Sequence, residues 1–259
     1  MAGTKKRVIV VQPRDLQLMR AMTVMRLIDR EQARVVAGFR SVTRANARLL
    51  LLFQAGYLRR TFVGSVGCGR KAIYALTTSG ALLIGIEPAM LKQPVGNIRQ
   101  GQLYYEHQLK LNQIYLQLRG LREVTPSHQL LSWQTFSRPI VPNLPLIPDA
   151  YCLVETSSGN LACFIEADLG TETRRIWKQK VSVYYSLAVS GEFERHFHQK
   201  QFRVLVVTTS QRRIRHLQEV IRQQTEKMFF LISFEDLQRD GLLGAKWYRP
   251  RGNEPQSFS

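Results

Sequence analysis

Cysteine is scarce in this sequence of 259 residues, which contains only Cys68, Cys152 and Cys163. The three positions match no metal-binding spacing, so a zinc-type cysteine cluster is excluded. An odd number of cysteines in a reducing compartment indicates free thiols. We expect Cys152 and Cys163 to pack in hydrophobic cores.

Long apolar runs are also missing. The basic triplet at residues 5–7 is followed by four apolar residues only, before Gln12-Pro13 interrupts them. A secretory signal or a membrane-spanning helix needs a longer apolar stretch. We therefore expect a cytoplasmic protein, associated with the nucleoid or a plasmid, with no membrane partner.

Acidic residues are few, because 19 Asp and Glu stand against 37 Lys and Arg, a formal net charge of +18. Residues 1–100 hold 17 cationic and 4 acidic side chains, whereas residues 101–259 hold 20 and 15. A concentrated positive field attracts the phosphate backbone of nucleic acid, and it would also attract an acidic protein or an anionic membrane. Nucleic acid is the favoured partner.

Three short helices are expected in the first sixty residues. Apolar residues recur at helical spacing over residues 13–28. A capping pattern at Asp29 starts a second helix. Ser41 is a suitable N-cap for a third helix, which ends at Gly56.

A glycine-rich turn joins two strand-like segments, residues 57–63 and 70–76, after these helices. Three helices followed by a two-stranded wing is the order of a winged helix-turn-helix, whose third helix enters the major groove of double-stranded DNA. Winged helices also serve as protein-interaction modules, but the positive field favours DNA. The expected DNA-binding residues are Arg40, Thr43, Arg44, Arg48, Arg70 and Lys71.

The length of the chain favours two domains. A stretch with proline and glycine separates the wing from a strong amphipathic helix. We predict a winged-helix domain over residues 1–86, a linker over residues 87–101 and a second domain over residues 102–259. We also expect a homodimer.

Two acidic motifs of the second half, Pro148-Asp149 and Glu166-Ala167-Asp168, adjoin apolar runs typical of buried strands. Alternate residues of a strand share a face, so Glu166 and Asp168 should point the same way. A turn at residues 156–160 would fold their strand back toward Asp149. Three carboxylates suit Mg²⁺ or Mn²⁺. Alternatively, Asp149 caps a turn and the other two solvate a strand end.

Helices and strands alternate around these motifs. The expected elements are a helix at 103–119, a strand at 130–133, the two acidic strands, a basic helix from Thr171, a strand at 202–208, a helix at 211–227 and a strand at 228–232. This order predicts an α+β protein whose second domain is an α/β unit with a mixed sheet and helices on its faces.

This order, with Pro148-Asp149 and Glu166-x-Asp168, resembles the core of the PD-(D/E)xK nuclease superfamily. The superfamily places a lysine where this chain has Asp168. The resemblance implies a divalent-metal-dependent DNA endonuclease in which Asp149, Glu166 and Asp168 hold the metal and act in catalysis.

The helix that follows the acidic strand supplies two candidate catalytic cations, Lys178 and Lys180. Lys180 lies roughly 12 Å along the helix from Glu172, so we expect Lys178 to be nearer to the site. The alternative is that both lysines belong to a solvated basic face.

The chain from residue 13 to 248 also resembles the replication-relaxation family of plasmid and mobile-element proteins. The resemblance rests on the Arg-Asp pair of the first helix, Leu76-Thr-Thr-Ser-Gly80, His107, Pro148-Asp149, Glu166-x-Asp168-x-Gly170-Thr171-Glu172, Lys180-x-x-x-Tyr184 and Trp247. It implies DNA binding in replication, relaxation or transfer. Two functions stay open: metal-dependent DNA cleavage, or a non-catalytic regulator whose second domain is a scaffold for dimerisation or for docking a relaxase or replication protein.

Overall fold

The structure is a computed structural model that describes residues 9–64, 69–91, 98–244, 246–252 and 254–256. Its residues form two compact units, Met1–Gln113 and Ile114–Ser259. The division falls inside the long helix α5, which spans Ile98–Arg119. The boundary between the units therefore lies beyond the linker that we predicted at residues 87–101. Residues 92–97 of that linker lie outside the described residues.

Buried amide groups explain why the first half of α5 belongs to the N-terminal unit. The side-chain nitrogen of Asn112 donates a hydrogen bond of 2.7 Å to the carbonyl of Leu27. The side-chain nitrogen of Gln32 donates one of 2.8 Å to the carbonyl of Leu109. Breaking such bonds would leave buried polar groups unsatisfied, so these residues fold as part of the N-terminal unit.

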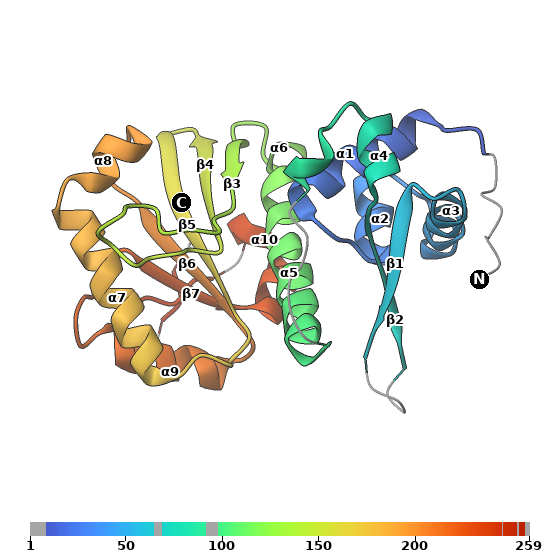
Figure 1. Cartoon of the computed structure of the whole chain (residues 1–259). Helices are drawn as coiled ribbons and strands as arrows, with labels where there is room; N and C mark the ends of the chain where they lie inside the picture. The colour runs from blue at the N-terminus through green and yellow to red at the C-terminus, as the bar shows by residue number, and fades with distance from the viewer. Residues whose placement is uncertain (1–8, 65–68, 92–97, 245, 253, 257–259) are drawn as a thin grey trace. The chain divides into compact units, whose positions relative to one another are not determined.

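The N-terminal unit contains the three predicted helices and the predicted hairpin (Figure 1). Its elements are α1 (Pro13–Met25), α2 (Arg30–Val36), α3 (Val42–Gln54), β1 (Leu58–Val63), β2 (Lys71–Leu76), α4 (Thr78–Leu83) and the 3-10 helix η1 (Pro88–Met90). The predicted caps are present, because the Asp29 carboxylate accepts from the Gln32 amide and the Ser41 hydroxyl accepts from the Arg44 amide. Ile28 pairs with Tyr74 and adds a bridge beside the β1–β2 hairpin.

Arg48 of α3 forms an ion pair with Asp15 of α1. Its Nε donates to one Asp15 oxygen at 2.8 Å, and its Nη2 donates to the Val10 carbonyl at 2.7 Å. The Asp15 side chain is fully buried and that of Arg48 is 14% exposed. Arg48 was expected among the DNA-binding residues, but its guanidinium is bound inside the N-terminal unit. A buried carboxylate needs a cation, and Arg48 provides it.

The C-terminal unit is an α/β unit built on one mixed sheet, as predicted. Its elements, beyond the end of α5, are α6 (Leu121–Val124), β3 (Gln129–Gln134), β4 (Ala150–Thr156), β5 (Gly159–Asp168), α7 (Arg174–Val189), α8 (Glu192–Phe197), β6 (Arg203–Thr208), α9 (Gln211–Ile221), β7 (Phe229–Ser233) and α10 (Phe234–Gly244). The strand order is β3-β4-β5-β6-β7. The pairs from β3 to β5 are antiparallel, and those from β5 to β7 are parallel.

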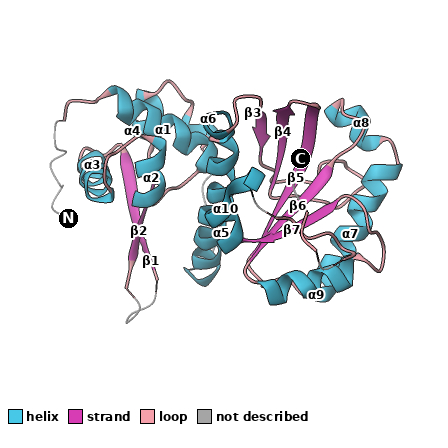
Figure 2. Ribbon diagram, turned by 180° about the vertical axis from the view of Figure 1, so that it is seen from behind, coloured by secondary structure: helices cyan, strands magenta, loops and turns pink. Residues whose placement is uncertain are grey.

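Helices cover both faces of this sheet (Figure 2). On one face, α7, α8 and α9 pack on a core that includes Phe164, Trp177 and Leu217. On the other face, Tyr115 of α5 packs against Trp133 of β3 with ring centroids 5.2 Å apart. Cys152 and Cys163 are buried and free, as predicted, whereas Cys68 lies outside the described residues. No helix in the described ranges has the length and hydrophobicity to cross a membrane.

The Asp15–Arg48 pair generates a prediction for stability. Arg48→Ala would leave the buried Asp15 carboxylate without its cation, and we expect it to lower the free energy of unfolding by about 3 kcal/mol. Urea titration of the full chain, followed by circular dichroism, measures this. Arg44→Ala is the matched control, because Arg44 is exposed on the same helix. Equal stabilities of the two variants would contradict the role of Arg48.

Candidate functional site

Two of the three predicted acidic residues share one face of the C-terminal sheet, and the third lies beside the end of their strand. In β5, Glu166 and Asp168 alternate with the core residues Ala162 and Phe164, and all four belong to the face covered by α7. Asp149 immediately precedes β4, and its Oδ2 accepts a hydrogen bond of 2.7 Å from the amide of Ala167. The predicted hairpin therefore brings Asp149 to the end of β5 where the other two carboxylates lie.

Glu166 is buried, with 1% of its side chain exposed, and α7 supplies both of its partners. Lys180 Nζ donates to Glu166 Oε2 at 2.9 Å, and the Tyr184 hydroxyl donates to Oε1 at 2.6 Å. Lys180 also forms an ion pair of 2.7 Å with Glu172, in the loop between β5 and α7. One lysine thus links the end of the strand to the loop that follows it.

The path of the chain explains why Lys180 reaches the site. After β5 the chain reverses, and α7 runs back along the strand, so that Trp177 contacts Asp168 and Lys180 contacts Glu166. Three residues of helix advance about 4.5 Å and two residues of strand about 6.6 Å. The long lysine side chain spans the difference.

The expectation that Lys178 is the nearer cation is wrong. Lys178 is exposed, and its carbonyl accepts a hydrogen bond from Gln224. Side chains three or four residues apart share a face of a helix, so Trp177, Lys180 and Tyr184 face the sheet together. Lys178 is on a different face of α7.

Asp168 is bound to a different cation. Arg213 of α9 donates to both of its oxygens, at 2.8 and 2.9 Å, and the Thr208 hydroxyl donates at 2.6 Å. Burial raises the pKa of Asp168, but the bonds from Arg213 and Thr208 lower it more, so it lies below the usual value. The same guanidinium donates to the carbonyl of Glu172 at 2.7 Å. Arg213 therefore fixes the strand end and the loop in place.

The buried carboxylate of Glu166 has an altered acidity. Burial raises the pKa of Glu166 to about 7, an effect that Lys180 opposes and that the negative charge of Asp149 strengthens. Burial lowers the pKa of Lys180, but the carboxylates of Glu166 and Glu172 raise it more. Burial and the Glu166 carboxylate raise the pKa of Tyr184, so the phenol stays a proton donor.

The carboxylates do not form a three-membered metal site. No group of three or more His, Cys, Asp or Glu side chains within the described ranges is arranged to hold a metal ion. The prediction that Asp149, Glu166 and Asp168 converge on one cation is wrong for Asp168. Both of its carboxylate oxygens accept hydrogen bonds from Arg213.

Asp149 and Glu166 remain as a pair of carboxylates. Mg²⁺ commonly binds through one or two carboxylates together with a substrate phosphate, and the pair fits that mode. The Oε2 atom of Glu172 adds a further acceptor beside Lys180, because it is buried and has no hydrogen-bond partner among the residues that the structure describes.

The sequence patterns did not predict Glu172, Tyr184 or Arg213 as part of this site. Glu172 and Tyr184 occur in the motifs that the family resemblance quotes, but neither was assigned a role. The spacing Lys180-x-x-x-Tyr184 was the available signal, because it places both side chains on the same face of a helix.

Comparison with known families agrees with the resemblance seen in the sequence. The replication-relaxation family matches residues 14–201, more than half of the chain, and the chain belongs to this family. The matched residues include Asp149, Glu166 and Lys180, while Arg213 lies beyond them. No curated protein and no solved structure matches the chain.

The raised pKa of Glu166 predicts a pH-dependent stability. Its proton is lost at about pH 4.3 in the unfolded chain and at about pH 7 in the folded one. The folded state holds more protons between these values, so stability falls as the pH rises, by up to about 1.4 kcal/mol per unit. Glu166→Gln should remove this slope.

Urea unfolding between about pH 4.5 and pH 8, in buffer without divalent metal, tests this prediction. Glu155→Gln is the control, because Glu155 is exposed on the neighbouring strand β4. Parallel profiles for the wild type and Glu166→Gln would show that Glu166 does not titrate in this range.

Proposed function

Because the chain belongs to the replication-relaxation family, we propose that it acts on double-stranded DNA of a plasmid or mobile element, in replication or relaxation. The N-terminal unit binds the duplex. The C-terminal unit brings its cluster of Asp149, Glu166 and Lys180 to the bound DNA. Duplex DNA is thus the proposed partner.

The order of elements in the N-terminal unit supports a winged helix. Three helices precede the β1–β2 hairpin, and Ile28, between α1 and α2, forms a single-residue antiparallel bridge with Tyr74 of β2. In winged helices the third helix enters the major groove and the hairpin contacts the backbone. Here α3 and the β1–β2 hairpin take these positions.

The exposed side chains of α3 carry the proposal. Thr43 and Arg44 are exposed in its first turn, Ala47 is exposed one turn later, and Arg40 is exposed just before the N-cap Ser41. Arginine and threonine at this position suit phosphates and base edges. Arg48 has no part in this surface, because it is bound to Asp15.

The proposed wing residues differ from each other. Arg70 is exposed. Lys71 is half exposed and pairs with Asp29 at 2.5 Å, which offsets its charge. Arg70 is therefore the stronger candidate for a backbone contact. Residues 65–68 of the predicted tip lie outside the described residues.

The double variant Arg40→Ala/Arg44→Ala tests the DNA-binding face. If each arginine contacts one phosphate, the slope of log affinity against log salt should flatten by about two, and affinity should fall at least about tenfold near physiological salt. Fluorescence anisotropy with a labelled duplex measures both quantities. Neither substitution removes a buried ion pair, so the fold should be retained.

Arg20→Ala is the control for charge, because Arg20 is exposed on α1. It should leave the salt slope close to that of the wild type. An unchanged slope and affinity in the double variant would remove α3 as the recognition helix.

DNA cleavage is a second candidate function, favoured by one contact. The PD-(D/E)xK nucleases have a lysine on the strand at the position of Asp168. Here Lys180 of α7, whose Nζ lies 2.9 Å from the Glu166 carboxylate, would supply that positive charge instead. Asp149 and Glu166 would hold Mg²⁺, which, when bound, neutralises phosphate charge and lowers the pKa of a water molecule. Lys180 would keep a positive charge beside the phosphate.

In the proposed hydrolysis, a water oxygen forms a bond to phosphorus and the bond from phosphorus to the sugar oxygen breaks. The water releases one proton to solvent, and the departing sugar oxygen takes up one proton. Arg213 positions the strand end through Asp168.

Nicking of supercoiled plasmid in millimolar Mg²⁺ or Mn²⁺ tests this activity. Lys180→Ala should reduce the rate by about a hundredfold or more, as expected for loss of a group that stabilises developing charge. Lys178→Ala should leave the rate unchanged, because Lys178 is exposed on another face of α7.

Asp149→Asn should abolish the metal-dependent nicking, because it removes one of the two proposed metal ligands. An absence of nicking by the wild type, with DNA binding intact, would instead support the regulator in which the C-terminal unit is a scaffold for dimerisation or for docking a relaxase or replication protein. The two assays thus separate binding from cleavage.

A further inference from the structure

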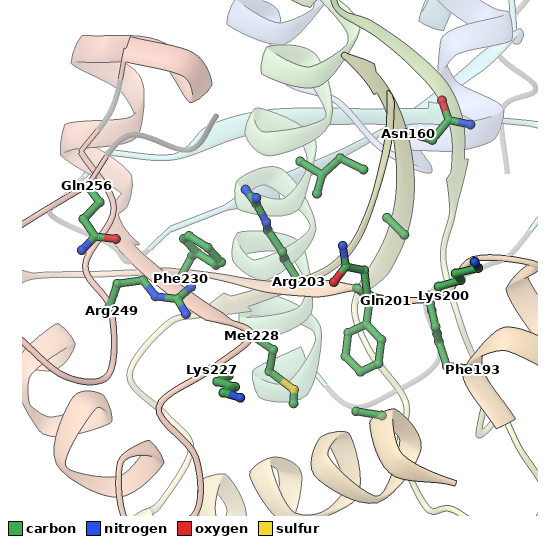
Figure 3. Close-up of a pocket in the computed structure, with 14 residues that line it drawn as sticks. Asn160, Phe193, Lys200, Gln201, Arg203, Lys227, Met228, Phe230, Arg249 and Gln256 are labelled. Carbon is green, nitrogen blue, oxygen red and sulfur yellow. The ribbon is translucent and has the colours of Figure 1, made fainter. Parts of the chain in front are cut away.

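A cavity of about 480 Å³ opens at the beginning of the three parallel strands of the C-terminal unit (Figure 3). Its lining includes Asn160 at the start of β5, Arg203 at the start of β6 and Phe230 at the start of β7. Cavities of this size accommodate small organic molecules.

The polar side chains around the cavity are cationic or neutral. Lys200, Arg203, Lys227 and Arg249 contribute four cations, and the 14 lining residues include no Asp or Glu. Three acidic residues adjoin lining residues in the sequence: Glu226 pairs with Arg251 at 3.3 Å, Glu192 pairs with Arg195, and Glu194 is exposed. The lining therefore favours an anionic ligand.

Two of these cations are held in place by an aromatic ring. The guanidinium of Arg249 lies 4.0 Å from the centroid of Phe230, and that of Arg203 lies 4.9 Å from it (Figure 3). Burial lowers the pKa of Arg249, and the neighbouring charge of Arg203 lowers it further. An anion between such like charges would relieve their repulsion.

The remaining lining is apolar. Phe193, Phe202 and Met228 form part of the wall, and the amides of Gln201 and Gln256 lie among the lining groups. A nucleotide combines an anionic phosphate with a flat base that packs on aromatic or guanidinium surfaces and bonds to amides. An acidic peptide would use the cations but not these apolar surfaces.

This cavity is separate from the acidic cluster. Leu161 lines the cavity and Glu166 follows five residues later on β5, a separation of about 17 Å along the strand. One end of the strand thus carries carboxylates and the other borders a cationic cavity.

We propose that this cavity binds a nucleotide, with Arg203, Arg249 and Lys227 holding the phosphate and the apolar wall accepting the base. The nucleotide is either free or the phosphorylated end of a DNA strand. This binding is independent of the cluster at Asp149 and Glu166 and of the DNA-binding face of α3.

Fluorescence anisotropy of the full chain with deoxyadenosine monophosphate labelled on the sugar tests the proposal. The expected result is saturable binding that unlabelled nucleotide displaces. A tetranucleotide with a 5′-phosphate that competes better than the mononucleotide identifies a strand end, whereas the reverse order identifies a free nucleotide. The variant Arg40→Ala/Arg44→Ala should bind the probe like the wild type, which separates this site from α3.

Three substitutions locate the site. Arg249→Gln should weaken binding about tenfold, as expected for one lost charge-assisted contact. Lys227→Gln should weaken it several-fold, and this exposed residue can be changed without disturbing the core. Arg251→Gln is the matched control and should have no effect, because Arg251 is paired with Glu226 and is absent from the lining.

Four outcomes would overturn the proposal. The first is an absence of saturable binding at millimolar nucleotide, and the second is equal binding by wild type, Arg249→Gln and Lys227→Gln. The third is displacement of the probe by inorganic phosphate as strong as that by the nucleotide. The fourth is displacement by hexaglutamate stronger than that by the tetranucleotide. The third would remove the role of the base, and the fourth would assign the cavity to an acidic peptide.

Discussion

The burial of two carboxylates at the end of β5 is the constraint on which the C-terminal unit depends. Glu166 and Asp168 lie on the covered face of the sheet, where an unpaired charge would cost several kcal/mol. Cations from two helices offset this cost: Lys180 of α7 pairs with Glu166, and Arg213 of α9 pairs with Asp168. Each cation also binds the loop residue Glu172. The crossover helices, the loop and the strand end are therefore fixed by the same ionic network, and the site inherits its geometry from the fold.

The N-terminal unit also neutralises its buried carboxylates with cations from neighbouring elements. Asp15 is buried between helices, and Arg48 neutralises it. Asp29, which caps α2, is similarly paired with Lys71 of the hairpin. Two of the cations that the sequence assigns to DNA thus stabilise the unit itself. The field available to a DNA phosphate is smaller than the charge count suggests, and it is concentrated in exposed residues such as Arg44.

Local patterns were sufficient to predict most elements, because caps, turns and periodicity act over a few residues. They gave the three helices, the hairpin, the mixed sheet and the shared face of Glu166 and Asp168. They gave neither α8 nor α10, whose short or kinked patterns lack a clear periodicity. These patterns did not predict the contacts of three cationic side chains, Arg48, Lys178 and Lys180. The partner of a charged side chain depends on which distant segment packs against it, and spacing along the chain contains no such information.

The two ends of β5 differ in how their charges are balanced. At one end, carboxylates are tolerated because lysine and arginine neutralise them from within the protein. At the other end, Arg203 and Arg249 share one aromatic ring, and no carboxylate lines the cavity beside them within the described part of the chain. Internal pairing satisfies the first end, so in the proposed cleavage a phosphate must compete with Glu166 and Glu172 for Lys180, or approach the acidic pair together with a cation. In the proposed nucleotide complex, a phosphate at the second end would meet this cationic lining without a bridging metal ion.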